Sequence, residues 1–178
     1  MLIRVIRVIR VIRVRNKRIR NNKSVLIMYA ISLKQAENLI QQFENGTLPK
    51  SEWTHEAHLI VGLKMVLTYK EQAFSEMKKR IIRFNESIGT INSESSGYHE
   101  TLTVFWLWAI QQFCNEKGIT QFDVAAVDEL LFYEPLSRRK LVEDYYSEAI
   151  LLLPESRRRF IRPDAQPLRG VEYFLPQK

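Results

Sequence analysis

Two of the three histidines in this 178-residue chain lie three positions apart in the segment SEWTHEAHLIVGL, residues 51–63. They are His55 and His58, and the third, His99, lies in the segment GYHETLTVFWLW. Both segments are rich in large apolar side chains, which is typical of helices that other helices surround. A buried imidazole needs a hydrogen-bond partner, a metal or a ligand. We therefore predict a buried polar pocket that the three imidazoles share.

The spacing of these histidines is compatible with metal binding. His55 and His58 share one helix surface, and His99 could complete a set of three imidazoles. Such a set binds one divalent metal, Zn²⁺ or Fe²⁺, and leaves positions open for water or substrate. Glu52 and His55 have the Glu-x-x-His spacing of helical di-iron proteins. Ser96 occupies the matching position before His99, however, which disfavours a di-iron centre.

Several residues near the histidines could act on a substrate. Glu56 and Glu100 each follow a histidine directly, and either could serve as a general base or orient an imidazole. Near the C-terminal end, Arg158 and Arg162 could hold a carboxylate or phosphate, and Tyr145 could offer its hydroxyl. We therefore predict a small acidic molecule as substrate. A hydrolytic and an oxidative reaction both remain open.

A second interpretation gives the histidines a purely structural role. Each ring could bond a backbone carbonyl and a hydroxyl inside the core. The protein would then be a non-enzymatic binding or interaction module, and the substitution His99→Ala would lower its thermal stability. The metal-dependent interpretation instead requires a pocket lined by all three imidazoles.

The elements that must position these residues are helical, and the fold class we predict is all-α. The expected architecture is an antiparallel bundle of five to six helices, connected by short loops and followed by an extended C-terminal tail. Capping residues and apolar periodicity place the helix boundaries. The predicted helices run from Ser32 to Gly46, Ser51 to Tyr69, Lys70 to Gly89, Tyr98 to Gly118, Asp123 to Pro135 and from Ser137 through Leu141 and Tyr146.

The helices that carry the histidines are apolar on nearly every side, so we expect them at the centre of the bundle. Gly62 lies inside the first of them, four residues after His58. A glycine within a helix costs about 1 kcal/mol relative to alanine. It therefore indicates a close approach by another element or room for a ligand.

The positive charge of the chain is concentrated at its N-terminus. Residues 1–27 contain nine of the 27 Lys and Arg residues, no acidic residue and the repeat IRVIRVIRVIRV. This three-residue period builds no apolar face on a helix or on a strand. We interpret residues 1–27 as a non-native or disordered basic extension, with Met28 as the natural start. A basic arm for RNA or a membrane surface is the alternative.

Residues 28–178 form a single predicted domain with a mildly acidic balance, so we expect no nucleic-acid partner for it. In residues 1–27, the arginines interrupt every apolar run before it is long enough for a signal peptide or a membrane span. Cys114 is the only cysteine, which rules out an intrachain disulfide. A cytoplasmic location is the resulting expectation. The sequence leaves the oligomeric state open.

The motifs WTHEAHL and GYHETLT, with the later segments YYS and RRRFIRPDAQPL, resemble a group of uncharacterised bacterial helical proteins. The similarity extends from about Met28 to Gly170. It implies a cytoplasmic all-α protein, and it brings no activity or ligand with it.

Overall fold

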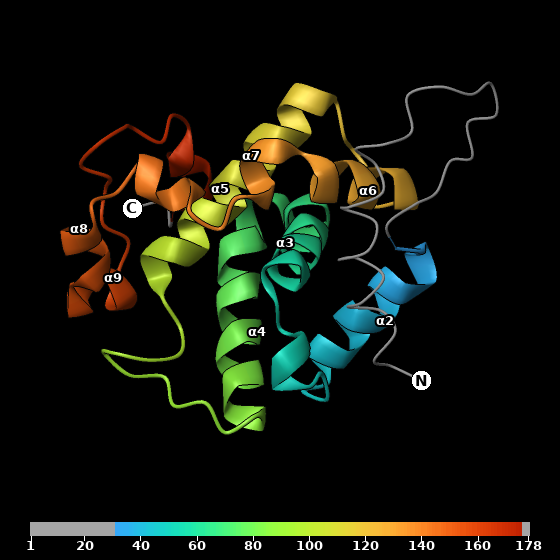
Figure 1. Ribbon diagram of the computed structural model, residues 1–178, viewed down its shortest axis with the longest axis horizontal. Helices are drawn as coiled ribbons and strands as arrows, with labels where there is room; N and C mark the ends of the chain where they lie inside the picture. The colour runs from blue at the N-terminus through green and yellow to red at the C-terminus, as the bar shows by residue number, and fades with distance from the viewer. Residues whose placement is uncertain (1–30, 176–178) are drawn as a thin grey trace, which may run out of the picture.

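The computed structural model describes residues 31–175, and every regular element in this range is helical. The predicted all-α fold is therefore confirmed. The basic extension predicted for residues 1–27 lies outside the described range. The α-helices are α2 (Leu33–Glu44), α3 (His55–Tyr69), α4 (Ala73–Ser87), α5 (Glu100–Lys117), α6 (Val124–Phe132), α7 (Glu134–Ser137), α8 (Glu148–Leu152) and α9 (Pro154–Arg158) (Figure 1). The 3-10 turns are η1 (Lys50–Glu52), η2 (Lys70–Gln72), η3 (Leu141–Asp144) and η4 (Val171–Phe174).

Side-chain caps define most of the long helices. Ser32 and Gln35 form the predicted capping box at the start of α2, and Asp123 caps α6 as expected. Gly118 ends α5 with a φ of 66°, a left-handed conformation that glycine adopts without strain. α3 begins later than predicted, because Thr54 is its cap and η1 precedes it.

The sixth helix predicted from Ser137 is wrong. Ser137 ends α7, and the backbone at Arg138 is extended, so Arg138 does not form the first turn of a helix capped by Ser137. The chain turns at this point and brings Val142 and Tyr146 into the core through the single turn η3. The actual cap is Ser147, whose side chain accepts a hydrogen bond at the start of α8.

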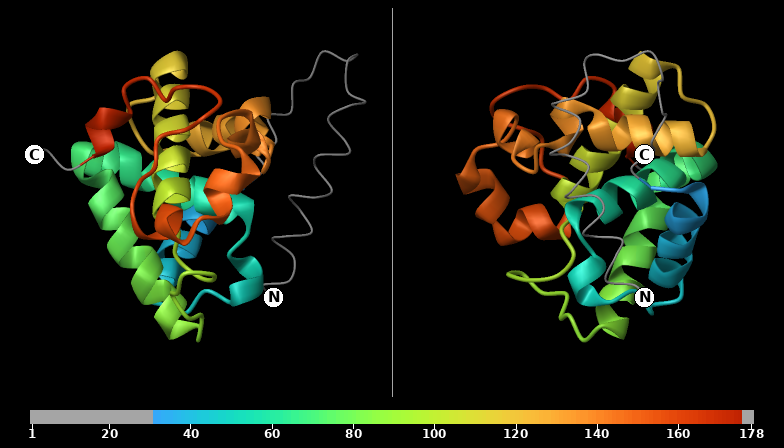
Figure 2. Two further views of the ribbon diagram at one scale, coloured as in Figure 1. Left: turned by 90° about the vertical axis from the view of Figure 1, so that its left-hand side faces the viewer. Right: turned by 45° about the vertical axis from the view of Figure 1, so that its right-hand side comes forward.

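Three helices form the centre of the bundle. α3 and α5 pack against each other, α4 packs against both, and α2 contacts α3 and α4 (Figure 1). α8, α9 and the irregular segment 159–170 lie on the side of the bundle opposite α2 (Figure 2). There α9 and η4 contact α5. α3 and α5 bury apolar residues on nearly every side, as predicted. No helix among residues 31–175 is both long and apolar enough to cross a membrane.

Gly62 lies on the side of α3 that packs against α5. A Cβ atom at Gly62 would lie 2.5 Å from Cδ1 of Ile110 and 3.9 Å from Cδ2 of Leu107. The glycine therefore admits the Ile110 side chain between the two helices, which explains its position in the middle of a helix.

Candidate functional site

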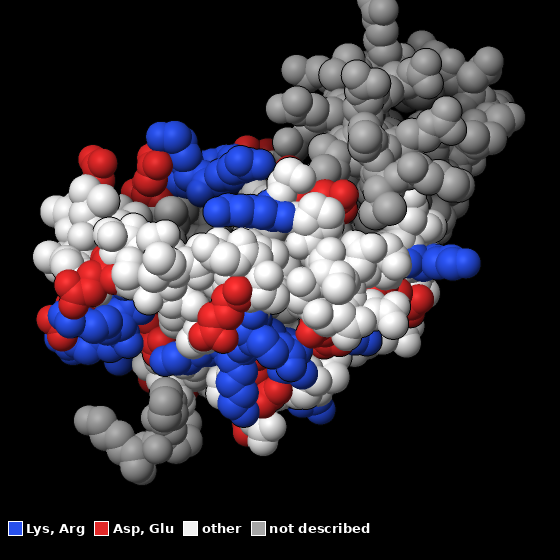
Figure 3. Space-filling view, turned by 90° about the horizontal axis from the view of Figure 1, so that it is seen from below, with Lys and Arg blue, Asp and Glu red and all other residues white. Residues whose placement is uncertain are grey.

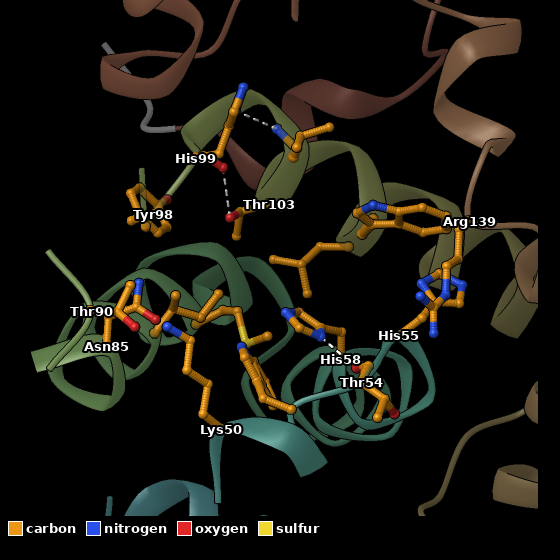
Figure 4. Close-up of a pocket in the computed structure, with 18 of the residues that line it drawn as sticks. Lys50, Thr54, His55, His58, Asn85, Thr90, Tyr98, His99, Thr103 and Arg139 are labelled. Carbon is orange, nitrogen blue, oxygen red and sulfur yellow. Dashed lines mark hydrogen bonds between the residues drawn. The ribbon is translucent and has the colours of Figure 1, made fainter. Parts of the chain in front are cut away.

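A cavity of about 550 Å³ opens between α3, α4 and α5 and is also bordered by η1 and the segment before α5. All three histidines of the chain line it. Its apolar wall consists of Trp53, Gly62, Met77, Ile81, Ile88, Leu102, Trp106, Leu107 and Ile110. The remaining lining residues are Lys50, Thr54, His55, His58, Asn85, Thr90, Gly97, Tyr98, His99, Thr103 and Arg139 (Figure 4).

His58 points into the middle of this cavity (Figure 4). Its Nδ1 lies 2.6 Å from the backbone oxygen of Thr54, and its ring lies on Trp53 with 3.8 Å between the ring centroids. A carbonyl oxygen only accepts hydrogen bonds, so Nδ1 carries the proton and Nε2 has a free lone pair. Burial lowers the pKa of His58 to about 4, so the ring is neutral near pH 7.

His55 lies at the side of the cavity where Arg139 is found (Figure 4). Its Nε2 donates to the backbone oxygen of Leu136 at 2.8 Å, which ties α3 to α7. The edge of its ring meets Trp106 with 4.8 Å between the centroids. This imidazole therefore connects two elements that lie far apart in the sequence.

The ring of His99 points away from the other two (Figure 4). Its Nδ1 accepts a hydrogen bond from the backbone N–H of Leu102 at 3.3 Å, so His99 is the N-terminal cap of α5. Its Nε2 therefore carries the proton and donates to the backbone oxygen of Leu151 at 3.2 Å. The Ser156 hydroxyl lies 3.3 Å from the same nitrogen. Both ring nitrogens are thus engaged within the protein.

The three imidazoles border one cavity but do not aim at one point. Within residues 31–175, no group of three His, Cys, Asp or Glu side chains lies close enough together to hold a metal ion. His99 could bind a metal only by giving up either the cap of α5 or its bond to Leu151. The geometry therefore does not support the three-histidine ligand set, and a bound Zn or Fe stays a prediction.

The two glutamates expected to act as bases lie outside the cavity lining. Glu56 lies 4.0 Å from Arg139. Burial opposes its ionisation, but hydrogen bonds from its own backbone N–H and from Thr54 hold the pKa of Glu56 below its ordinary value. Glu100 is buried and forms an ion pair of 2.6 Å with Lys78. Both carboxylates are thus paired with a basic side chain.

The residues expected to bind substrate also lie outside the lining. Arg158 pairs with Glu94 at 2.6 Å, and Arg162 pairs with Glu172 at 3.0 Å, both at exposed positions. On the face shown in Figure 3, Lys and Arg side chains lie beside Asp and Glu in the same way. The ring of Tyr145 packs on aromatic residues of α5.

The polar lining residues Lys50, Asn85, Thr90 and Arg139 were not predicted from the sequence. Lys50 lies in η1, and Arg139 lies in the turn between α7 and η3. Nothing in the local sequence distinguishes them from other exposed basic residues. Asn85 had a usable signal, because it lies one turn after Ile81 on the buried face of amphipathic α4. A polar residue at such a position requires a partner or a pocket.

The Tyr98 hydroxyl is an unpaired polar group in the wall of the cavity, and its removal should not lower the stability of the protein. Its oxygen is buried and has no hydrogen-bond partner among the described residues, and burial raises the pKa of Tyr98, so the group stays neutral. We expect Tyr98→Phe to leave the free energy of unfolding unchanged or to raise it by about 1 kcal/mol, because an unpaired buried hydroxyl is removed. Urea denaturation measures the change.

Tyr146→Phe is the matched control for this prediction. Tyr146 is also buried, but its hydroxyl donates to the backbone oxygen of Ile161 at 2.9 Å. Its removal leaves that carbonyl unpaired, so the free energy of unfolding should fall by about 1–2 kcal/mol. Equal losses in both variants would show that the Tyr98 hydroxyl has a partner after all.

No family model, no curated protein and no solved structure matches this chain. The resemblance carried by the motifs WTHEAHL and GYHETLT therefore stays a prediction. The function we propose rests on the chemistry of the cavity.

Proposed function

We propose that the cavity binds a small organic acid whose apolar body fits between α3, α4 and α5. The charge of the lining carries this proposal. Two basic residues, Lys50 and Arg139, border the cavity, and no Asp or Glu lines it; Glu56, 4.0 Å from the exposed guanidinium of Arg139, lies outside the lining. Both are exposed, so their charges lie at the rim, where an acidic group could stay partly hydrated.

The size and walls of the cavity support the same ligand class. A volume of about 550 Å³ is within the range of small-molecule sites, which are mostly apolar with a few oriented polar groups. Trp53 and Trp106 offer flat aromatic surfaces, and Leu107 and Ile110 add branched apolar side chains to the wall. A carboxylate on an aromatic or branched apolar body matches this combination.

Binding of three probes with the same apolar body tests the proposal. They are 3-phenylpropionate, 3-phenylpropanol and 3-phenylpropylammonium, which share the phenylethyl body and end in an anionic, a neutral and a cationic group. Isothermal titration calorimetry should give the tightest binding for the acid and the weakest for the ammonium. Lys50→Met and Arg139→Met should each weaken binding of the acid about 5-fold, the effect of one partly screened charge.

The control for these variants is Lys34→Met. Lys34 is also exposed, but it lies on α2 outside the cavity lining. It should leave binding of all three probes unchanged, and none of the variants should alter binding of the alcohol. Equal affinity for acid and ammonium would contradict the proposal.

The metal-dependent enzyme remains the second candidate function, because one observation favours it. The Nε2 lone pair of His58 faces the cavity and could bind Zn²⁺ or Fe²⁺ together with a ligand group or water. Elemental analysis of the purified protein tests this version, with His58→Asn as the control. Metal below about a tenth of an equivalent, or equal content in both proteins, would remove it.

A further inference from the structure

The interior of the cavity exposes hydrogen-bond acceptors. The first is Nε2 of His58, because its Nδ1–H is held by the Thr54 carbonyl. The second is the Thr103 hydroxyl oxygen: its proton is donated to the backbone oxygen of His99 at 2.9 Å, so only lone pairs remain. Both groups line the space that an apolar ligand body would fill.

Asn85 supplies a third acceptor, and a short network fixes its orientation. The backbone N–H of Tyr98 donates to Oδ1 of Asn92 at 2.9 Å, which identifies that atom as the oxygen. Asn85 must therefore present its amide nitrogen to Asn92, at 2.7 Å. Its Oδ1 has no partner among the described residues, although Asn85 is only 6% exposed and lines the cavity.

Cationic donors are found at the rim, and the indole N–H groups of Trp53 and Trp106 are further donors of the wall. The basic groups of Lys50 and Arg139 are exposed, and Figure 4 shows them on opposite sides of His58. Three further hydroxyls belong to the wall: those of Thr90 and Tyr98 have oxygens that are fully covered by protein, and that of Thr54 caps α3 by accepting from the backbone N–H of Ala57. The cavity thus combines cations at its opening with lone pairs in its interior.

We propose that the acid bound here carries a hydroxyl or N–H group on its apolar body, which donates to His58 and Asn85 inside while the acid stays at the rim. This inference rests on the proposed function and narrows its ligand class. A purely apolar body would leave these acceptors without a partner, and an unpaired buried acceptor weakens binding. The low pKa of His58 keeps its lone pair available at neutral pH.

Calorimetry with four matched acids tests this inference. The probes are 3-phenylpropionate, its 3-hydroxy and 4-hydroxy ring derivatives, and its 4-methoxy ring derivative, which accepts hydrogen bonds but donates none. At least one hydroxy derivative should bind about 10-fold tighter than both the parent and the methoxy compound. Binding of all four with equal affinity would overturn the inference and leave the proposed function standing. Binding of none would overturn both.

The substitution His58→Asn identifies the acceptor. An Asn amide at this position can still donate to the Thr54 carbonyl, but its acceptor Oδ1 lies closer to the backbone than Nε2 of His58, so the preference for the hydroxy derivative should fall to about 2-fold. His99→Asn is the control, because both nitrogens of His99 are engaged away from the cavity centre. It should keep the 10-fold preference. An unchanged preference in His58→Asn would overturn the role of His58, even if the absolute affinities shift.

Discussion

Replacing His99 by alanine should lower the free energy of unfolding by about 2–3 kcal/mol. His99 is 7% exposed and makes two kinds of contact that alanine cannot make. Its Nδ1 caps the longest helix of the described range, and its Nε2 holds the backbone oxygen of Leu151 in α8. Loss of a helix cap costs about 1 kcal/mol, and loss of a buried hydrogen bond costs a similar amount. Urea denaturation at pH 7.5 measures the sum.

His99→Asn separates these two contributions. Asparagine is a good cap residue, so this variant should recover about 1 kcal/mol, but its shorter side chain does not reach Leu151. Relative to the unmutated protein, hydrogen exchange of the α8 and α9 amides should accelerate more than that of the α3 amides in both variants. The reason is that the bond from His99 to Leu151, which holds α8, is missing. A loss below about 0.5 kcal/mol in His99→Ala would show that His99 does not hold these elements together.

Acidification should destabilise the protein through His58. The folded pKa of about 4 lies below the ordinary value of 6.5, so between these two values the unfolded chain binds the extra proton. The stability attached to His58 is therefore complete above pH 6.5, falls as the pH is lowered and levels off below about pH 4. The expected loss between pH 7.5 and pH 5 is about 2 kcal/mol.

The control for the pH dependence is again His58→Asn, which cannot titrate in this range. Its free energy of unfolding should fall less steeply between pH 7.5 and pH 5. Burial also lowers the pKa of His99, so a smaller slope of the same sign should remain. An NMR titration of the imidazole C–H signals locates each pKa directly. A His58 value near 6.5 would contradict the buried, neutral ring that we describe.

The two interpretations of the histidines apply to different members of the set. His99 is bound at both nitrogens and fits the structural role. His58 presents one nitrogen to the cavity and fits a binding role. The sequence could not separate these roles, because the imidazoles differ only in what lies opposite them. For His99 the partner is Leu151, 52 residues further along the chain.

The helices could be predicted well where their signals are local. Ser32 with Gln35, Asp123 and Gly118 define helix ends through atoms within a few residues, so the sequence alone located them. The prediction failed after Ser137, where the backbone follows the demands of packing Val142 and Tyr146 into the core. Ser137 is a residue type that favours helix caps, but it ends α7, because the chain turns after it.

By itself the sequence determined an all-α bundle, two apolar central helices and the presence of imidazoles beside Gly62, because helix periodicity and capping act over short distances. The tertiary structure alone decided which ring nitrogens face the cavity and which polar residues complete it. Lys50 and Arg139 line one cavity although 89 positions separate them, because η1 leads into α3 and the hydrogen bond from His55 to Leu136 ties α7 to α3. Ligand chemistry depends on such long-range placement, which no local pattern encodes.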